Sequence, residues 1–279
     1  MTGGNDEVAL VTGAGSGIGA ALILAAAKRG MHVVACDYRV ETLEPLAHEA
    51  SQAGAASVTC RALDVRDAAA FEQLAAEVCA DTGGIDLLFC NAGVLSAGRL
   101  WESSADEIDR LIDINVKGVI NAIRACVPRM IERAMPSRVV ITGSMGGFVP
   151  SPMLATYSAS KAAVAAIAET LHFDLQASRA PVAVSLLAPG AVRTGIFATD
   201  RVDPVTQPMM EAMRVGAERV GMDPTRVAEL TFDAIDRGDF WVFPHPEMLP
   251  AVPERIERML AGEAPHFDFQ RSFRQPASR

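Results

Sequence analysis

A tyrosine and a lysine four residues apart, Tyr157 and Lys161, are the side chains in this sequence best suited to moving a proton. At positions i and i+4 of a helix they lie on one face, so the ammonium can sit beside the phenol and favour its ionised form. Such a pair also arises by chance on solvated helix faces. Its meaning therefore depends on the residues that other elements bring to it.

Ser144, thirteen residues before Tyr157, directly follows an apolar run at 138–142. A hydroxyl at the end of a buried strand can donate a hydrogen bond to a substrate oxygen, although by itself it would be interpreted as a loop serine. Hydride transfer at a carbinol carbon also moves the hydroxyl proton, so an acid/base must reach that oxygen. For Tyr157 to act as the base, its pKa must fall from near 10 towards 7, and the positive charge of Lys161 would favour this fall.

Apolar, β-branched runs alternate with longer segments of helical period, which is typical of a parallel sheet with crossover helices. The runs are nearly all apolar, as in strands covered on both faces. They lie at residues 8–11, 31–36, 57–60, 87–90, 138–142, 182–187 and 240–243. The sequence therefore predicts one α/β domain over residues 1–279, a three-layer Rossmann fold with a doubly wound, mainly parallel, seven-stranded sheet.

Two segments break this alternation. Residues 191–221 are rich in proline and methionine and are interpreted as a substrate lid; they include Pro204, Pro208, Met209, Met210 and Met213. Asp223 and Pro224 then predict the N-cap and first position of a helix. From about residue 262 the periodicity is lost, and the tail at 262–279 is expected to fray or to pack on another subunit; its arginines are Arg271, Arg274 and Arg279.

Composition and charge exclude several classes of protein. A formal net charge of -9 argues against a nucleic-acid partner, because there is no basic excess to neutralise phosphates. Five scattered cysteines without Cys-x-x-Cys spacing indicate reduced thiols and a cytoplasmic protein. Neither a signal-peptide pattern nor an apolar run of about 18 residues occurs, so no membrane association is expected. The five histidines lack metal-ligand spacing, and no metal is expected.

A glycine-rich turn directly follows the first apolar run and precedes a helical run at 20–28. Glycines there let the backbone turn tightly and bring amide N–H groups against a pyrophosphate. Gly13, Gly17 and Gly19 form the better structural set, and a purely structural turn is the alternative that the strand and helix context disfavours. The residues expected to bind a dinucleotide are Gly13, Gly15, Ser16, Gly17, Ile18 and Gly19.

Asp37 follows the second apolar run, about 20 residues beyond the turn. A carboxylate there accepts hydrogen bonds from a ribose diol and repels a 2′-phosphate, which favours NAD over NADP. Arg39 could pair with Asp37, face solvent or meet a phosphate, so NADP remains the alternative.

Taken together, these motifs resemble the short-chain dehydrogenase/reductase family over about residues 6–245. The motifs are Thr12-Gly13-x-x-x-Gly17-x-Gly19, Asp64, Asn91-Ala92-Gly93, Asn115, Ser144, Tyr157 with Lys161, Pro189-Gly190 and Thr194. The resemblance implies an NAD(P)-dependent oxidoreductase acting on a CH–OH group. It also implies a homo-oligomer, a tetramer or dimer, formed through the helices that carry Asn115 and Tyr157.

The resemblance further assigns sites along the cofactor. It implies Asp64 and Val65 at the adenine, although Asp64 could instead cap a helix before Arg66, and Asn91 could simply form a turn. The other residues implied at the cofactor are Asn91, Ala92, Gly93, Tyr157, Lys161, Pro189, Gly190, Val192 and Thr194. Asn115, a buried amide that needs partners, would hold a water leading to Lys161. Cys90 departs from the family, which often has a second asparagine there.

The expected substrate contacts are soft, apolar side chains around the acid/base, which suit an apolar or aromatic substrate. They are Met145, Val94, Phe148 and Met153, in addition to Ser144 and Tyr157 themselves, with Leu95, Val149, Phe197 and the methionines of residues 191–221 nearby. Methionines at helical spacing could equally be core or subunit contacts. Residues 118–130, 146–148 and 243–247 are partly similar to members that oxidise benzylic alcohols in aryl ethers.

The sequence therefore predicts an NAD-dependent dehydrogenase for a secondary alcohol or ketone. An NADPH-dependent ketoreductase of the same fold is the nearer alternative. A non-catalytic nucleotide-sensing protein is the alternative from another class, and the presence of both Tyr157 and Lys161 argues against it.

Overall fold

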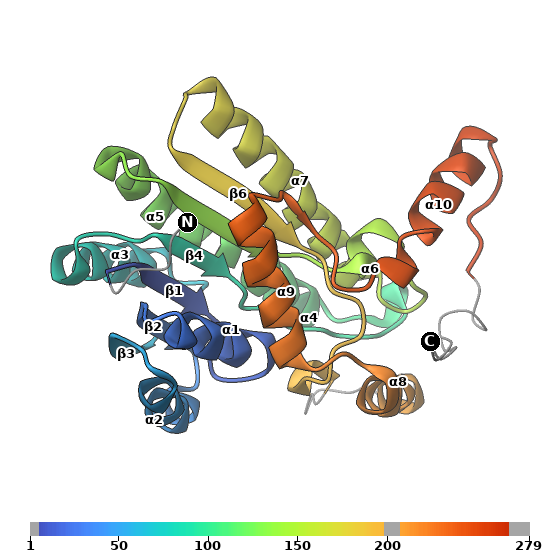
Figure 1. Cartoon of the computed structure of the whole chain (residues 1–279). Helices are drawn as coiled ribbons and strands as arrows, with labels where there is room; N and C mark the ends of the chain where they lie inside the picture. The colour runs from blue at the N-terminus through green and yellow to red at the C-terminus, as the bar shows by residue number, and fades with distance from the viewer. Residues whose placement is uncertain (1–5, 198–206, 268–279) are drawn as a thin grey trace.

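The computed structural model describes residues 6–197 and 207–267 and is built on a seven-stranded sheet (Figure 1). Every strand pairing is parallel, and the strand order is β3-β2-β1-β4-β5-β6-β7. The strands are β1 Val8–Thr12, β2 His32–Asp37, β3 Ser57–Ala62, β4 Leu87–Cys90, β5 Ser137–Thr142, β6 Val182–Leu187 and β7 Trp241–Val242. The predicted fold class is confirmed, and each of the seven apolar runs contains a strand.

Helices cover both faces of the sheet (Figure 1). The helices are α1 Gly17–Lys28, α2 Leu43–Ala53, α3 Ala68–Thr82, α4 Ala105–Ile112, α5 Gly118–Arg133, α6 Met145–Phe148, α7 Ala155–Ala177, α8 Gln207–Val220, α9 Pro224–Arg237 and α10 Ala251–Leu260. Side chains of α3, α5 and α7 pack on one face, and those of α1, α2 and α9 on the other. Successive residues of β1 point to opposite faces of the sheet, since Leu10 belongs to the first of these cores and Val11 to the second.

The order of the strands creates a switch point between β1 and β4. From β1 the chain proceeds outward to β2 and β3, then returns to β4 and continues the other way. The loops after β1 and β4 therefore diverge to opposite faces and leave a crevice at the carboxyl ends of the strands, where doubly wound sheets bind ligands. The glycine turn and the segment Asn91 to Gly93 follow these two strands.

The segment at 191–221 leaves and rejoins the sheet through a short two-stranded contact. The Arg193 amide donates to the carbonyl of Met222 at 2.9 Å, and the Met222 amide donates to the carbonyl of Ala191 at 3.0 Å. α8 lies within this segment, whereas Pro204 lies outside the described residues. The predicted N-cap of α9 is confirmed, because the Asp223 carboxylate accepts from the Thr225 amide and Pro224 occupies the first turn.

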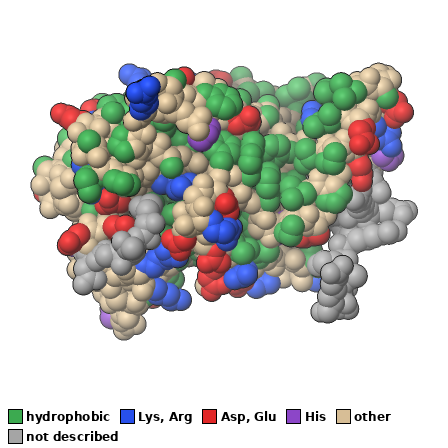
Figure 2. All heavy atoms as spheres, turned by 45° about the horizontal axis from the view of Figure 1, so that its top comes forward, with side chains coloured by type: hydrophobic (Ala, Val, Ile, Leu, Met, Phe, Trp, Pro, Cys, Tyr) green, Lys and Arg blue, Asp and Glu red, His purple; other side chains and the backbone are tan. Residues whose placement is uncertain are grey.

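The C-terminal part of the chain contains a helix that was not predicted. α10 projects away from the sheet (Figure 1), and none of its residues is buried. Figure 2 shows a broad run of hydrophobic side chains on the upper face of the molecule. Large apolar side chains exposed on the structure include Phe173 of α7 and Trp241 of β7. The predicted tail arginines, Arg271, Arg274 and Arg279, lie outside the described residues.

Within residues 6–197 and 207–267, no helix combines the length and the apolar character needed to cross a bilayer.

Candidate active site

The glycine turn after β1 leaves no room for side chains at Gly13, Gly15, Gly17 and Gly19. Gly13 and Gly17 adopt left-handed conformations, with φ of 64° and 55°. A Cβ on Gly13 would come within 2.8 Å of the Cα of Ala92, and one on Gly17 within 2.9 Å of the Thr194 side chain. The Ser16 side chain makes no capping bond to α1. This cradle fits a dinucleotide, because backbone amides at the start of α1 can approach a pyrophosphate closely.

Asp37 ends β2 beside this turn, and both of its carboxylate oxygens are held by backbone amides. The Gly15 amide donates to Oδ2 at 2.9 Å, and the Arg39 amide donates to Oδ1 at 2.9 Å. The Arg39 side chain is exposed and forms no ion pair with Asp37 in this structure. The structure therefore does not match the alternative in which Arg39 pairs with Asp37, and the other two alternatives for Arg39, solvent or a 2′-phosphate, stay predictions.

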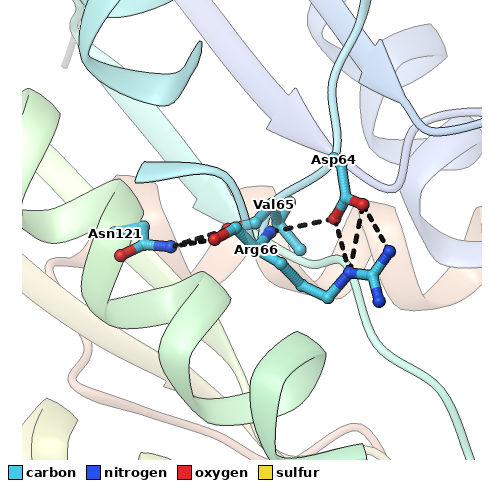
Figure 3. A network of polar contacts seen from close by, with 4 residues as sticks. All are labelled: Asp64, Val65, Arg66 and Asn121. Carbon is cyan, nitrogen blue, oxygen red and sulfur yellow. Dashed lines mark hydrogen bonds and ion pairs between the residues drawn. The ribbon is translucent and has the colours of Figure 1, made fainter. Parts of the chain in front are cut away.

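Asp64 and Arg66 form a tight ion pair after β3 (Figure 3). The Arg66 Nε lies 2.9 and 3.0 Å from the two carboxylate oxygens, and these hydrogen bonds lower the pKa of Asp64. Asn121 of α5 donates to the carbonyl of Val65 at 2.9 Å and so anchors this loop. The alternative in which Asp64 caps a helix is wrong, because Asp67 is the N-cap of α3. Sequence analysis did not identify Arg66 or Asn121 as partners here.

Thr12 and Asn91 join the loops after β1, β4 and β5. The Thr12 hydroxyl accepts from the amides of Asn91 and Ala92, at 3.0 and 3.1 Å, and donates to the carbonyl of Phe89. The Asn91 side chain donates to the carbonyls of Thr12 and Gly13 and accepts from Thr142 at 3.3 Å. Asn91 thus does more than form a turn, since its side-chain amide links the carboxyl ends of β1 and β5.

Asn115 is buried in a π-helical turn, Asp113–Lys117, between α4 and α5. Its Oδ1 accepts from the Val94 amide at 2.8 Å, and its Nδ2 donates to the Val94 carbonyl at 2.9 Å and to Ser160 Oγ at 3.1 Å. Ser160 in turn donates to the carbonyl of Tyr157 at 2.7 Å. The costly buried amide is therefore satisfied by protein groups, and it ties α7 to the segment after β4. The roles of Val94 and Ser160 were not predicted.

Tyr157 and Lys161 lie on the inner side of α7, where their relative exposures are 8% and 4%. Lys161 Nζ donates to the carbonyl of Thr142 at 2.9 Å and lies 5.9 Å from the centre of the Tyr157 ring. Ser144, which follows β5, lies close to the Tyr157 ring, since a Cβ on Gly146 would meet both side chains, and its Oγ accepts from the Gly146 amide at 3.0 Å. The structure thus brings together the predicted tyrosine, lysine and serine.

Burial dominates the titration of both groups. It lowers the pKa of Lys161 to about 8, because an ammonium is costly to remove from water. Burial raises the pKa of Tyr157, and the hydrogen bond with Ser144 acts in the opposite direction. The net shift of the Tyr157 pKa is therefore upward in this structure, and the expectation that Lys161 lowers it stays a prediction.

An apolar cluster surrounds Tyr157. Its residues are Leu95, Leu111, Leu154, Tyr157 and Met210, with Val94, Ala97, Ile196, Phe197 and Met213 packed against them. Five of the expected apolar contacts, Val94, Leu95, Phe197, Met210 and Met213, are therefore found together. Leu111 and Leu154 were missed, although both are apolar residues in helical or loop segments close to the expected ones. The side chain of Met209 lies outside the description.

Three other expected substrate contacts lie outside the cluster around Tyr157. The Phe148 ring packs edge-on against Trp241 and Phe243, with centroids 5.9 and 5.8 Å away. Met145 is buried. Met153 has a left-handed backbone, φ 61°, and its carbonyl accepts from the Gly98 amide at 2.8 Å. The contact of these three residues with a substrate stays a prediction.

Comparisons with known proteins agree with this fold. A family model described as short chain dehydrogenase matches residues 7–204. The solved structure of a short chain dehydrogenase/reductase from Burkholderia phymatum in complex with NAD superposes with a TM-score of 0.89 at 34% identity, covering 94% of this chain and 97% of that one.

Two curated relatives differ in how much of their length this chain spans. A "C alpha-dehydrogenase" from Sphingobium sp. strain SYK-6 is 29% identical over 271 residues, which is 93% of this chain and 87% of the relative. A Mycobacterium tuberculosis H37Rv protein named "Probable oxidoreductase EphD" is 37% identical over 194 residues, which is 70% of this chain and 32% of the relative. The chain thus spans about a third of that second protein.

Replacing Lys161 by methionine tests the cost of burying its ammonium. The pKa is about 8 when folded against 10.5 for the free side chain, so the unfolded state binds the extra proton between these values and stability rises with pH there. From pH 8 to about 9.5 the wild type should gain roughly 1.5 kcal/mol of unfolding free energy relative to Lys161→Met, measured by urea unfolding.

The control is Lys28→Met, which changes an exposed lysine at the end of α1. It should follow the wild type at both pH values. A difference between wild type and Lys161→Met that stays constant with pH would contradict the buried ammonium.

Proposed function

The chain belongs to the short-chain dehydrogenase family, and we propose on this premise that it transfers a hydride between NAD and a secondary alcohol or ketone. The observation that supports this most is the buried Tyr157, close to Ser144 and on one helix face with Lys161. These groups border the crevice whose glycine turn fits a dinucleotide.

In the proposed mechanism, Ser144 and Tyr157 together hold the substrate oxygen. Tyr157 accepts the hydroxyl proton during oxidation and returns it during reduction, since the group that moves this proton must lie within hydrogen-bond reach. When bound, oxidised nicotinamide supplies the hydride acceptor and a positive charge that favours the phenolate. Lys161, with a pKa of about 8, is mostly protonated at neutral pH and adds a second positive charge on the same side.

In the proposed proton route, Asn115 does not itself ionise; it would hold a water molecule that leads to Lys161. Its contacts to Val94 and Ser160 use both amide hydrogens and one oxygen lone pair, which leaves one acceptor site on Oδ1. A Cβ placed on Gly93 would meet both Asn115 Oδ1, at 3.4 Å, and Lys161 Nζ, at 3.5 Å. The two side chains therefore share one small space beside Gly93, which supports a relay from Lys161.

The proposed substrate is an apolar or aromatic alcohol of moderate size. The cluster around Tyr157 consists of aliphatic side chains, one phenylalanine and two methionines, which favour apolar surface and adapt to its shape. Residues 191–221 are proposed as the lid over this substrate, because Phe197, Met210 and Met213 belong to the cluster. The similarity to a C alpha-dehydrogenase adds support for a benzylic alcohol.

Replacing Tyr157 by phenylalanine tests the proposed acid/base. Aliphatic, steroidal and aryl secondary alcohols are assayed by NADH formation, and the best substrate is used with the variant. Turnover should fall about 100-fold or more, because general acid/base catalysis contributes at least that much, while NAD affinity stays within about threefold. Tyr38→Phe, which changes the other tyrosine, 73% exposed, is the control and should keep its turnover. Retained turnover in Tyr157→Phe would overturn the assignment.

The cofactor preference is proposed to depend on Asp37. Its carboxylate is fixed by two backbone amides at the end of β2 and would repel a 2′-phosphate. Initial rates should be at least tenfold higher with NAD than with NADP, and Asp37→Ala should narrow this ratio by about tenfold or more, because about 1.4 kcal/mol of repulsion is lost. A clear NADP preference in the wild type would instead favour a ketoreductase in which the exposed Arg39 meets the phosphate.

We also propose that the chain pairs with a second copy through α5 and α7. Their outer surfaces form an apolar groove flanked by Arg124 and Asp174; its lining is Ile120, Ile123, Arg124, Ala166, Ile167, Thr170, Leu171 and Asp174. Neither charge has a salt-bridge partner among the described residues. A two-fold axis would set Arg124 of one copy against Asp174 of the other.

Charge reversal tests this pairing. Arg124→Asp should convert the oligomer to smaller species in sedimentation, because two like charges would face each other at each end of the groove. Adding Asp174→Arg to the same chain should restore the assembly, which a simple folding defect would not do. A wild type that sediments as a monomer, or a double variant that stays dissociated, would contradict the proposal.

A further inference from the structure

His245 lies in the loop after β7, and both of its ring nitrogens contact the loop that follows β6. Its Nδ1 accepts from the Gly190 amide at 3.0 Å, and its Nε2 lies 3.0 Å from the carbonyl oxygen of Ala191. The ring is 7% exposed. Only a neutral ring with its proton on Nε2 satisfies both contacts, since Nδ1 must accept and Nε2 must donate.

The ring's surroundings keep it neutral near pH 7. Burial lowers the pKa of His245, and the carboxylate of Glu247 acts in the opposite direction. Protonation would place a hydrogen on Nδ1, directly against the Gly190 N–H, and would remove that hydrogen bond. The neutral ring, which burial favours, is therefore also the form that makes both hydrogen bonds, to Gly190 and to Ala191.

The segment held by His245 is fixed on its other sides as well. The Pro189 carbonyl accepts from the Met145 amide at 2.9 Å, one residue beyond Ser144. The Ala191 carbonyl also accepts from Met222 at 3.0 Å, where the segment at 191–221 returns. His245 and these two hydrogen bonds together fix residues 189–191, a set of contacts called the frame below. These residues lie between Ser144 and the start of the proposed lid.

Gly190 shows how closely this frame is packed. A Cβ at this position would come within 3.0 Å of the His245 ring carbon Cγ and would overlap the sulfur of Met248. The imidazole therefore lies directly against the peptide backbone, and no side chain is interposed. Loss of the ring would remove both hydrogen bonds and the surface against which this backbone rests.

We infer that His245 is a positioning residue that holds the Gly190–Ala191 backbone in place for the nicotinamide end of the cofactor. This inference rests on the proposed function and on the family resemblance, which implies Pro189, Gly190, Val192 and Thr194 at the cofactor; Pro189 and Gly190 lie beside the Ser144 loop, where the nicotinamide end would be. His245 acts through the loop backbone and takes no part in proton transfer. Its loss should therefore weaken the binding of NAD much more than it slows the chemical step.

Three variants separate the two contacts. His245→Asn retains an acceptor at the position of Nδ1 and loses the contact to Ala191, His245→Gln retains a donor near Nε2 and loses the contact to Gly190, and His245→Ala loses both. The control is His32→Ala on β2, whose Nδ1 lies 2.7 Å from Ser57 Oγ at the opposite end of the sheet. It should match the wild type in every measurement.

The first measurement is hydrogen exchange of a peptide spanning residues 188–195, without added cofactor. Exchange of the Gly190 amide should be at least about tenfold faster in His245→Ala and His245→Gln, and close to wild type in His245→Asn, because the amide then keeps its acceptor. Unchanged exchange in His245→Ala would overturn the inference, whether or not the protein turns over any alcohol.

The second measurement is the split between KM and kcat. In His245→Ala the KM for NAD should rise about tenfold while kcat changes less than about threefold, and His245→Asn should recover most of the loss. An unchanged KM would overturn the role at the cofactor, as would a fall in kcat alone. If the wild type shows no turnover, the proposed function fails. The role of His245 is then decided by the affinity for NAD, measured by tryptophan fluorescence. An affinity about tenfold weaker in His245→Ala supports this role, and an unchanged affinity overturns it.

Discussion

The site depends on the close approach of the loops that follow β1 and β4. Gly13 packs against Ala92 with no room for a Cβ, and the Thr12 hydroxyl binds two amides of the facing loop. This contact fixes the backbone up to Gly93, where Asn115 and Lys161 converge. The backbone of these two loops therefore determines the shape of the crevice, and the segments after the later strands place further side chains at its edge.

Burial and chemistry oppose each other at the proposed acid/base. Removing Tyr157 and Lys161 from water favours the neutral form of each group, and Lys161 retains a single hydrogen bond, to the Thr142 carbonyl. A phenol in this environment keeps its proton at neutral pH and suits donation to a ketone. In the proposed mechanism, acting as a base requires positive charge brought in with the oxidised cofactor, and the site would then respond to the redox state of the bound nicotinamide.

The sequence predicts most of the fold because its signals are local. Apolar runs locate the seven strands, and Asp223 with Pro224 locates the start of α9. The roles of Thr12, Ser160 and His245 were not predictable, because ordinary residue types acquire them through partners up to 80 positions away along the chain. The aromatic contacts of Phe148 were not predictable for a related reason, since only the folded chain brings Trp241 beside it. The pKa of Tyr157 depends on how far burial outweighs charge, which spacing does not reveal.

The most direct test of this account is the ionisation of Tyr157 itself. Because the chain has two tyrosines, Tyr38→Phe leaves Tyr157 as the sole phenol, and the ultraviolet absorbance of its phenolate can be titrated against pH. Without cofactor the pKa should lie above the ordinary value of 10; saturating NAD⁺ should lower it by about one unit or more, and NADH, whose ring is neutral, should lower it less. A pKa below 10 without cofactor, or one that NAD⁺ leaves unchanged, would contradict the account.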